Sequence, residues 1–326
     1  MCCCPRTMMC WCSTRKGEFT PMVGAFGGSM IDISGSSAVR INALDMEKGY
    51  ADDGKDPLPD KSEFVLSLFE QIMQDDLKAQ HRSIIDRCVQ AVYRPYIASG
   101  YKGDAPTLTN LQAEIKRQPE PEAQELALAA ELFISGSLSI FAQKTNVDQN
   151  NRLTSYNILD LGEQLLPMGM LVILESIYNR VIQNWRAGRR TWVFVDEFSI
   201  FFRYPFATNF FLRMWKQVRK RDGYMTGITQ NVGEMLTSKD ACWMLANSEF
   251  LIMLSQSASD RAALAELLNI SDTQLSYVEN ADPGCGLMKF GGAFIPFVNS
   301  FPEDTELYKL MTTKPADREQ VKPHGV

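Results

Sequence analysis

The sequence is short of positive charge. Its 326 residues contain 33 Lys and Arg against 39 Asp and Glu, which gives a net charge of −6. A strongly basic surface, the usual footprint of a nucleic-acid-binding protein, is therefore excluded. Contact with DNA is not indicated by the charge and would have to be local.

Long apolar runs are also scarce. The longest candidate, Leu165–Leu174, is interrupted by Pro167 and Gly169 and falls well short of the roughly 20 residues that a membrane-spanning helix needs. The N-terminus is polar and Cys-rich, without the apolar stretch of a secretory signal. These two absences favour a soluble, intracellular protein.

Residues suited to metal binding or disulfides are few or badly spaced. His81 and His324 have no partner pattern, and five of the eight cysteines crowd the first twelve residues, without the C-x₂-C spacing of zinc sites. Only Cys88, Cys242 and Cys285 lie in the body of the chain. We therefore predict a reduced body with no disulfide framework.

A phosphate-binding loop is missing too. Such a loop reads GxxxxGK[ST] between a strand and a helix. Only Gly49–Asp56 comes near this pattern. We reject it because its acidic residues would repel phosphate, Asp56 replaces the hydroxyl that binds Mg²⁺, and Pro57 and Pro59 are expected to prevent the following helix.

What is present is a regular alternation of strand and helix patterns. The predicted strands are residues 29–34, 191–195, 224–228 and 250–254, with a hairpin over 286–297 that turns at Gly291-Gly292. The predicted helices are residues 62–96, 107–116, 120–135, 165–185, 208–221 and 260–268. This order predicts an α/β protein with a parallel sheet flanked by helices, into which an all-helical segment is inserted.

The clearest chemical motif is Val193-Phe-Val-Asp196-Glu197. Ligands of open α/β sheets bind at the carboxyl ends of the strands, where an Asp can hold Mg²⁺ and an adjacent Glu can polarise an attacking water. This is the Walker B pattern. The alternative is a solvated acidic pair that ends a strand.

Two further motifs flank the next predicted strand. Thr229-Gln230 ends it, where a polar side chain can sense a γ-phosphate in register with Asp196-Glu197. Arg219-Lys220-Arg221 precedes it. This run is either a group of cations at a helix C-terminus or an arginine finger that reaches a neighbouring subunit's nucleotide.

These motifs, taken in order, resemble the VirB-type ATPases of type IV secretion and conjugation systems, the TrbE, TraC and CagE group with a TraG-like P-loop domain. The resemblance runs from about residue 17 to residue 297. Beyond the Walker B, Arg-Lys and Thr-Gln motifs, it rests on residues 17–20 (GEFT), 27–34 (GGSMIDIS), 40–45 (RINALD), 136–141 (GSLSIF), 145–148 (TNVD), 247–251 (NSEFL) and 281–287 (ADPGCGL).

The resemblance implies a RecA-like P-loop NTPase core with an all-helical insertion, assembled as a hexamer that uses ATP and Mg²⁺. By position, Asp196 would bind Mg²⁺, Glu197 would activate water, and Thr229 and Gln230 would contact the γ-phosphate. Arg219 or Lys220 would act at a subunit boundary. Implied partners are secretion-channel proteins of the inner membrane, and the implied location is the cytoplasmic face of that membrane.

The chain departs from the family at its start. The family has a P-loop strand and helix and then a strand reading roughly DPEGEY, of which Gly17-Glu18-Phe19 supplies only the end. We expect the first strand and P-loop to be missing and activity alone to be low. One hypothesis is that residues 1–16 are read out of frame; the alternatives are a genuine disordered head and a zinc-binding head.

The predicted organisation follows from these segments. It comprises an aberrant head (1–16), the start of the RecA-like core (17–61), a helical insertion (62–145), the core with Walker B (146–302) and a tail (303–326). Two other functions stay open: a non-catalytic docking module of the secretion complex, and a fragment of an FtsK/HerA-type DNA translocase. The acidic charge balance argues against the translocase.

Overall fold

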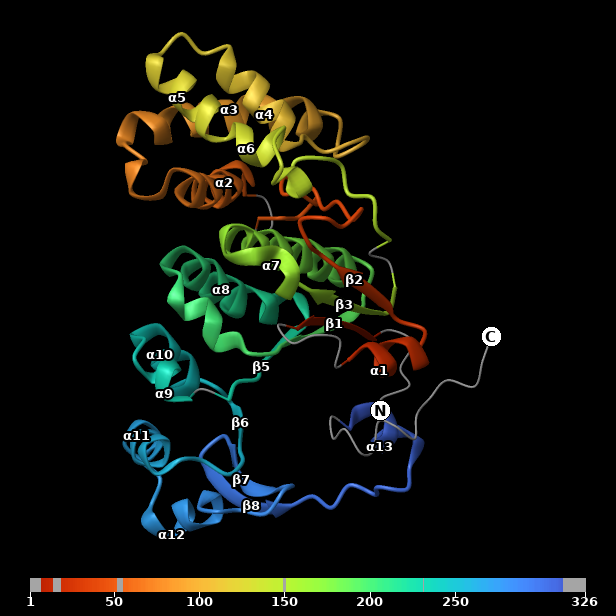
Figure 1. The fold of residues 1–326 in the computed structure, drawn as a ribbon, viewed down its shortest axis with the longest axis vertical. Helices are drawn as coiled ribbons and strands as arrows, with labels where there is room; N and C mark the ends of the chain where they lie inside the picture. Colours follow the sequence, from red (N-terminus) through yellow and green to blue (C-terminus); the bar gives the residue numbers. More distant parts are fainter. Residues whose placement is uncertain (1–6, 14–18, 52–54, 149–150, 231, 313–326) are drawn as a thin grey trace. The chain divides into compact units, whose positions relative to one another are not determined.

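The chain forms two compact units, each with its own sheet (Figure 1). The structure is a computed structural model that describes residues 7–13, 19–51, 55–148, 151–230 and 232–312. The first unit comprises Met1–Asp196 and Tyr204–Ile228, and the second comprises Glu197–Arg203 and Thr229–Val326.

The first unit is built on a five-stranded parallel sheet of order β2-β3-β1-β4-β5. Its strands are β1 (Thr7–Ser13), β2 (Ser29–Asp32), β3 (Leu153–Asn157), β4 (Arg190–Val195) and β5 (Gly223–Gly227). Val193 and Val195 of β4 are fully buried, as expected for an apolar run in a parallel sheet covered by helices. The predicted α/β class with a parallel sheet is confirmed.

The central strand comes from the Cys-rich head, so the interpretation of residues 1–16 as a segment apart from the core needs a correction. In β1, Met9 pairs with Leu153 of β3, and Cys10 pairs with Val193 of β4. Cysteine behaves as a small apolar residue and tryptophan favours strands, so this segment can occupy a sheet. The rest of the head lies outside the described residues, and the reading-frame hypothesis stays a prediction.

Strand β3 was not predicted. Its sequence is Leu-Thr-Ser-Tyr-Asn, yet all five residues are buried. Both faces of an inner parallel strand are covered, so burial here does not require the apolar run that marks β4.

Helices α7 (Gly162–Arg186) and α8 (Pro205–Val218) pack between the sheet and α2 (Leu58–Met73) (Figure 1). Among the described residues, α7 is the one helix long and apolar enough to cross a membrane, but 89% of its apolar window is buried inside the protein. Pro167 and Gly169 interrupt its apolar run but do not break the helix, in agreement with the helix predicted over residues 165–185. Pro167 lies near the start of the helix, and Gly169 accommodates Leu161, whose Cδ1 would lie 2.3 Å from a Cβ at that position.

The segment between β2 and β3 forms a layer of five helices. These are α2, α3 (Ala79–Ala98), α4 (Leu108–Lys116), α5 (Pro121–Ala129) and α6 (Glu131–Ile134), with short 3-10 turns at Gln74–Asp76 and Ser139–Phe141. One further helix of this unit, α1 (Thr20–Ala25), precedes β2, and another 3-10 turn, Leu159–Leu161, precedes α7.

The start of α2 corrects another expectation. Pro57 and Pro59 do not prevent a helix: Pro57 is the N-cap, Pro59 lies in the first turn, and Asp56 Oδ1 accepts a hydrogen bond of 3.0 Å from the Leu58 amide. Proline is tolerated there because first-turn amides have no partner within the helix. The rejected phosphate loop includes residues 52–54, which lie outside the described residues.

The second unit has a three-stranded antiparallel sheet, β6 (Phe250–Met253), β7 (Cys285–Phe290) and β8 (Ala293–Val298). The hairpin turns at Gly291-Gly292, as predicted. One face of the sheet packs through Met253 and Leu287 on a small apolar core. Its helices are α9 (Val232–Leu236), α10 (Lys239–Ala246), α11 (Ala258–Leu268), α12 (Asp272–Leu275) and α13 (Glu306–Met311), with 3-10 turns η4 (Phe198–Arg203) and η6 (Ser276–Val278).

Candidate functional site

The carboxyl ends of β4 and β5 lie side by side in the first unit. The amide of Ile228 donates a hydrogen bond of 2.8 Å to the carbonyl of Val195, which extends the parallel ladder by one step beyond β5. Asp196 directly follows Val195, and Thr229 directly follows Ile228. β4 and β5 are therefore neighbouring parallel strands, and each is followed by one of the two motifs.

Glu197 has an unusual backbone. Its φ is +51°, in the left-handed region that residues other than glycine seldom adopt. Such a conformation costs on the order of 1–3 kcal/mol and tends to occur at functional sites. The side chain is half-buried, and Phe198 and Ser199 after it are buried, so the surrounding packing holds the turn.

In the second unit, an ion pair joins the segment after Glu197 to the helix after Gln230. Arg203 is the last residue of η4, and Glu234 lies in α9. Arg203 Nε and Nη2 lie 2.5 and 3.0 Å from the two carboxylate oxygens of Glu234. The hydrogen bonds from Arg203 hold the pKa of Glu234 below its ordinary value. Sequence reasoning missed this pair because nothing in its 31-residue spacing marks it.

Arg219 and Lys220 lie in the 3-10 turn η5 (Arg219–Arg221) before the start of β5. Their side chains are exposed, whereas Arg221 is 4% exposed. The amide of Thr191 donates to the carbonyl of Asp222, so the amino ends of β4 and β5 meet here.

The Arg-Lys pair therefore lies at the opposite edge of the sheet from Asp196. β5 has five residues, which at about 3.3 Å per residue separates the two edges by about 16 Å. Both positions belong to the first unit. Asp196 and the Arg-Lys pair of one chain are thus too far apart to contact the same phosphate group.

The two units divide the predicted site residues. Asp196, Arg219 and Lys220 belong to the first unit, and Glu197, Thr229 and Gln230 belong to the second. The catalytic and binding roles of all six stay predictions.

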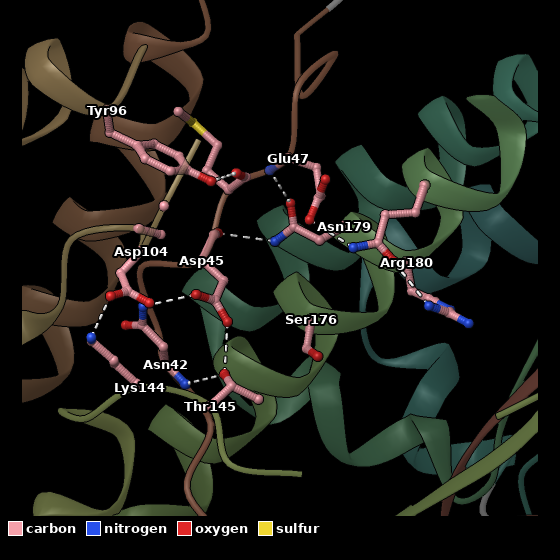
Figure 2. A pocket seen from close by; sticks show the side chains of 14 residues that line it. Asn42, Asp45, Glu47, Tyr96, Asp104, Lys144, Thr145, Ser176, Asn179 and Arg180 are labelled. Carbon is pink, nitrogen blue, oxygen red and sulfur yellow. Dashed lines mark hydrogen bonds and ion pairs between the residues drawn. The ribbon is translucent and has the colours of Figure 1, made fainter. Parts of the chain in front are cut away.

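A pocket of about 260 Å³ opens elsewhere, beside α7 (Figure 2). None of the predicted site residues lines it. Asp45 is its central charge: its oxygens accept hydrogen bonds from Asn42 Nδ2 at 2.8 Å and Thr145 Oγ1 at 2.7 Å. Burial raises the pKa of Asp45, and these hydrogen bonds partly offset that rise.

The pocket marks where the helical layer leaves and rejoins the sheet. The amide of Asn42 donates to Thr145 Oγ1 at 2.9 Å, and the amide of Arg40 donates to Asn146 Oδ1 at 2.7 Å. More than 100 residues separate the members of each pair, which tie the start of the helical segment to its end. We interpret the pocket as a structural junction.

The fold of this chain occurs in solved structures. VirB4 of Thermoanaerobacter pseudethanolicus superposes with a TM-score of 0.76 and 22% sequence identity, over 91% of this chain and 82% of that one. The chain has the fold of VirB4. This confirms, at the level of fold, the resemblance to the VirB-type ATPases and their RecA-like core.

Plasmid coupling protein TrwB is also similar. Its structure with ADP and Mg²⁺ matches with a TM-score of 0.45 and 12% identity, over 92% of this chain and 87% of that one. Its structure with the GTP analogue GDPNP matches with a TM-score of 0.45 and 13% identity, over 91% and 87%. No family model matches the sequence, and no curated protein matches it.

Proposed function

We propose that this chain is the Walker B-bearing part of a motor ATPase that serves type IV secretion or conjugation. The observation that carries the proposal is the hydrogen bond between Ile228 and Val195, which brings the carboxyl ends of β4 and β5 together directly before Asp196 and Thr229. The VirB4 fold supports the same assignment. In an α/β sheet, this edge is where nucleotide phosphates bind.

The donor set fits Mg²⁺ held jointly with a nucleotide. Asp196 offers a carboxylate oxygen, the hard ligand that this ion takes. Within the described ranges, no group of three or more His, Cys, Asp and Glu side chains could hold a metal by itself. Phosphate oxygens would complete the coordination sphere, as is usual for Mg²⁺.

The proposed roles follow from position. Asp196 would hold Mg²⁺, which neutralises charge on the phosphates when bound. Glu197 would accept a proton from the attacking water, and Gln230 would orient that water or sense the γ-phosphate. Arg219 and Lys220, at the other edge of the sheet, would reach a nucleotide of the next subunit, which fits a homo-hexamer.

The location and partners of this function are part of the proposal. We place the chain at the cytoplasmic face of the inner membrane, in contact with channel proteins of the secretion complex. Hydrolysis there would drive pilus assembly and transfer of DNA or protein.

The test begins with the DNA across codons 1–20 and its upstream flank. We expect a corrected frame that adds GxxxxGK[ST] upstream. The extended chain should then hydrolyse ATP, and Glu197→Gln should lower kcat by about 10²–10⁴-fold, the usual contribution of a general base. An unchanged frame with no P-loop upstream, or full activity in Glu197→Gln, would contradict the proposal.

A docking module is the second candidate, and a specific surface favours it. On the face of the second unit's sheet away from its apolar core, Phe250, Ile252 and Phe290 are each more than 50% exposed. Large exposed apolar patches mark interaction sites. Copurification with a P-loop-bearing subunit that loses activity in the complex would favour this candidate over the motor.

A further inference from the structure

A buried ion pair lies in the first unit, away from the strand ends. Lys61 Nζ of α2 lies 2.5 Å from Glu175 Oε1 of α7, and the two side chains are 0% and 2% exposed. Tyr50 Oη donates a hydrogen bond of 3.0 Å to Glu175 Oε2, and Lys61 Nζ donates one of 2.8 Å to the carbonyl of Asp45. Both carboxylate oxygens of Glu175 are thus bound by named donors.

The pair connects to the Arg-Lys motif through Tyr50. The carbonyl of Tyr50 accepts a hydrogen bond of 3.3 Å from Arg221 Nη2, and the Arg221 guanidinium lies over the Tyr178 ring at 5.3 Å. Tyr178 packs edge-on against Tyr50, with 5.6 Å between ring centroids. Arg221 is therefore held by Tyr50, which binds the ion pair, and by Tyr178, which packs on Tyr50.

A second connection reaches the motif from its other side. Tyr178 Oη donates a hydrogen bond of 2.5 Å to Gln217 Oε1, two residues before Arg219. Gln217 and Arg221 thus bracket the exposed Arg219 and Lys220, and both are tied to Tyr178.

Helix α8, which leads into the motif, also rests on α2. Arg213 Nη1 lies 2.7 Å from Glu63 Oε2, and the rings of Phe64 and Phe210 pack with centroids 5.5 Å apart. Helix α2 therefore contributes Lys61 to the ion pair and also contacts α8, the helix that leads into Arg219.

We propose that the Lys61–Glu175 pair, acting through Tyr50, positions Arg219 and Lys220 and links their orientation to the helical layer. The chemical role of Arg219 and Lys220 rests on the proposed function; the positioning does not. A buried ion pair is a weak source of stability, but removing one of its hydrogen bonds leaves a buried acceptor unsatisfied. Loss of such a hydrogen bond should therefore loosen the backbone around Arg219–Arg221, which is also bound by Tyr50 and Tyr178.

Hydrogen exchange of the backbone amides in the full chain tests this directly. Tyr50→Phe removes one hydroxyl from the network and leaves the ring and the carbonyl that binds Arg221. We expect exchange in residues 217–223 to rise about five- to tenfold more than in α4, which lies outside the network.

Tyr93→Phe is the matched control. Tyr93 is also fully buried, and its hydroxyl donates to the carbonyl of Leu44 rather than to Glu175. In Tyr93→Phe, amide exchange at residues 217–223 should rise no more than amide exchange in α4. An equal profile in the two variants would overturn the proposal.

A second variant, Gln217→Ala, tests the same proposal if Tyr50→Phe does not fold. Gln217 is half-buried on α8, so Gln217→Ala should fold. It should also speed exchange at residues 219–221, and unchanged exchange there would contradict the positioning role. Neither measurement requires ATP hydrolysis, so failure of the proposed function would not be mistaken for failure of this inference.

Discussion

At the residue scale, buried charged side chains of the first unit determine how its free energy of unfolding depends on pH. Asp45, Glu175 and Lys61 all lie where the loop before α2 meets α7. Burying a charged group is costly unless hydrogen bonds or an opposite charge compensate for the lost water, and here Asn42 donates to Asp45 and Lys61 donates to Glu175.

The Asp45→Asn variant should alter the pH dependence of stability. The folded-state pKa of Asp45 is raised above 3.8 by burial, so the folded chain binds a proton where the unfolded chain has lost it. Stability from this group is therefore present below the unfolded pKa and lost as pH rises through the folded pKa.

Urea unfolding of both proteins between pH 4 and pH 7 tests this sign. Relative to Asp45→Asn, the free energy of unfolding of the wild type should be higher at low pH by about 1.4 kcal/mol for each unit by which folding raises the pKa of Asp45. Thr145→Val should enlarge the effect, because the Thr145 hydroxyl lowers the pKa of Asp45. A difference that is constant or opposite in sign would contradict the account.

Cys88 should resist thiol reagents in the folded chain. Its side chain is fully buried, and burial raises its pKa to about 11, so almost no thiolate exists near neutral pH. Maleimide labelling at pH 8, followed by peptide mapping, should spare Cys88 and modify the half-buried Cys242 and Cys285. Labelling of Cys88 at the same rate as Cys242 would contradict the burial of the Cys88 thiol.

At the element scale, the contact between α1, β2 and β3 depends on one small residue. A Cβ on Gly28 would lie 2.7 Å from Val23 Cγ1 and 2.9 Å from the Leu153 carbonyl oxygen. Gly28→Ala should therefore destabilise the fold by about 1–3 kcal/mol, the usual cost of overpacking.

Gly24→Ala is the matched control for this contact. Gly24 is exposed within α1 and has nothing within 4 Å of an added Cβ, so alanine there should stabilise by about 0.5–1 kcal/mol. Thermal unfolding of the two variants should shift in opposite directions. A shift of equal sign would contradict the packing of α1 on β3.

Elements with a strong local pattern could be predicted from the sequence. The apolar run of β4, the capped α4 with Thr107 before it and the Gly291-Gly292 hairpin all match. β3 could not be predicted, since its burial comes from its place in the sheet and not from its own composition. The start of α2 differs from the expectation because Pro57 is the N-cap and Pro59 lies in the first turn, where proline is tolerated.

The candidate site was predicted in part. Its residue types and the neighbouring strand ends follow from the motifs. The positive φ of Glu197, the Arg203–Glu234 pair and the burial of Arg221 arise from tertiary packing, which a motif does not encode.

At the scale of the whole molecule, the chain combines the fold of VirB4 with a sequence that has no recognisable phosphate-binding loop. A P-loop normally supplies the backbone amides and the Lys that hold the β- and γ-phosphates. The chain should therefore carry the Mg²⁺ end of a nucleotide site without its phosphate cradle.

The most direct test is a calorimetric titration of MgATP into the wild-type chain and into Asp196→Asn. The account predicts a weak complex, with a Kd above about 100 µM, that weakens further in the variant. A micromolar Kd, or equal affinity in the two proteins, would contradict the claim that Asp196 marks a nucleotide site without its cradle.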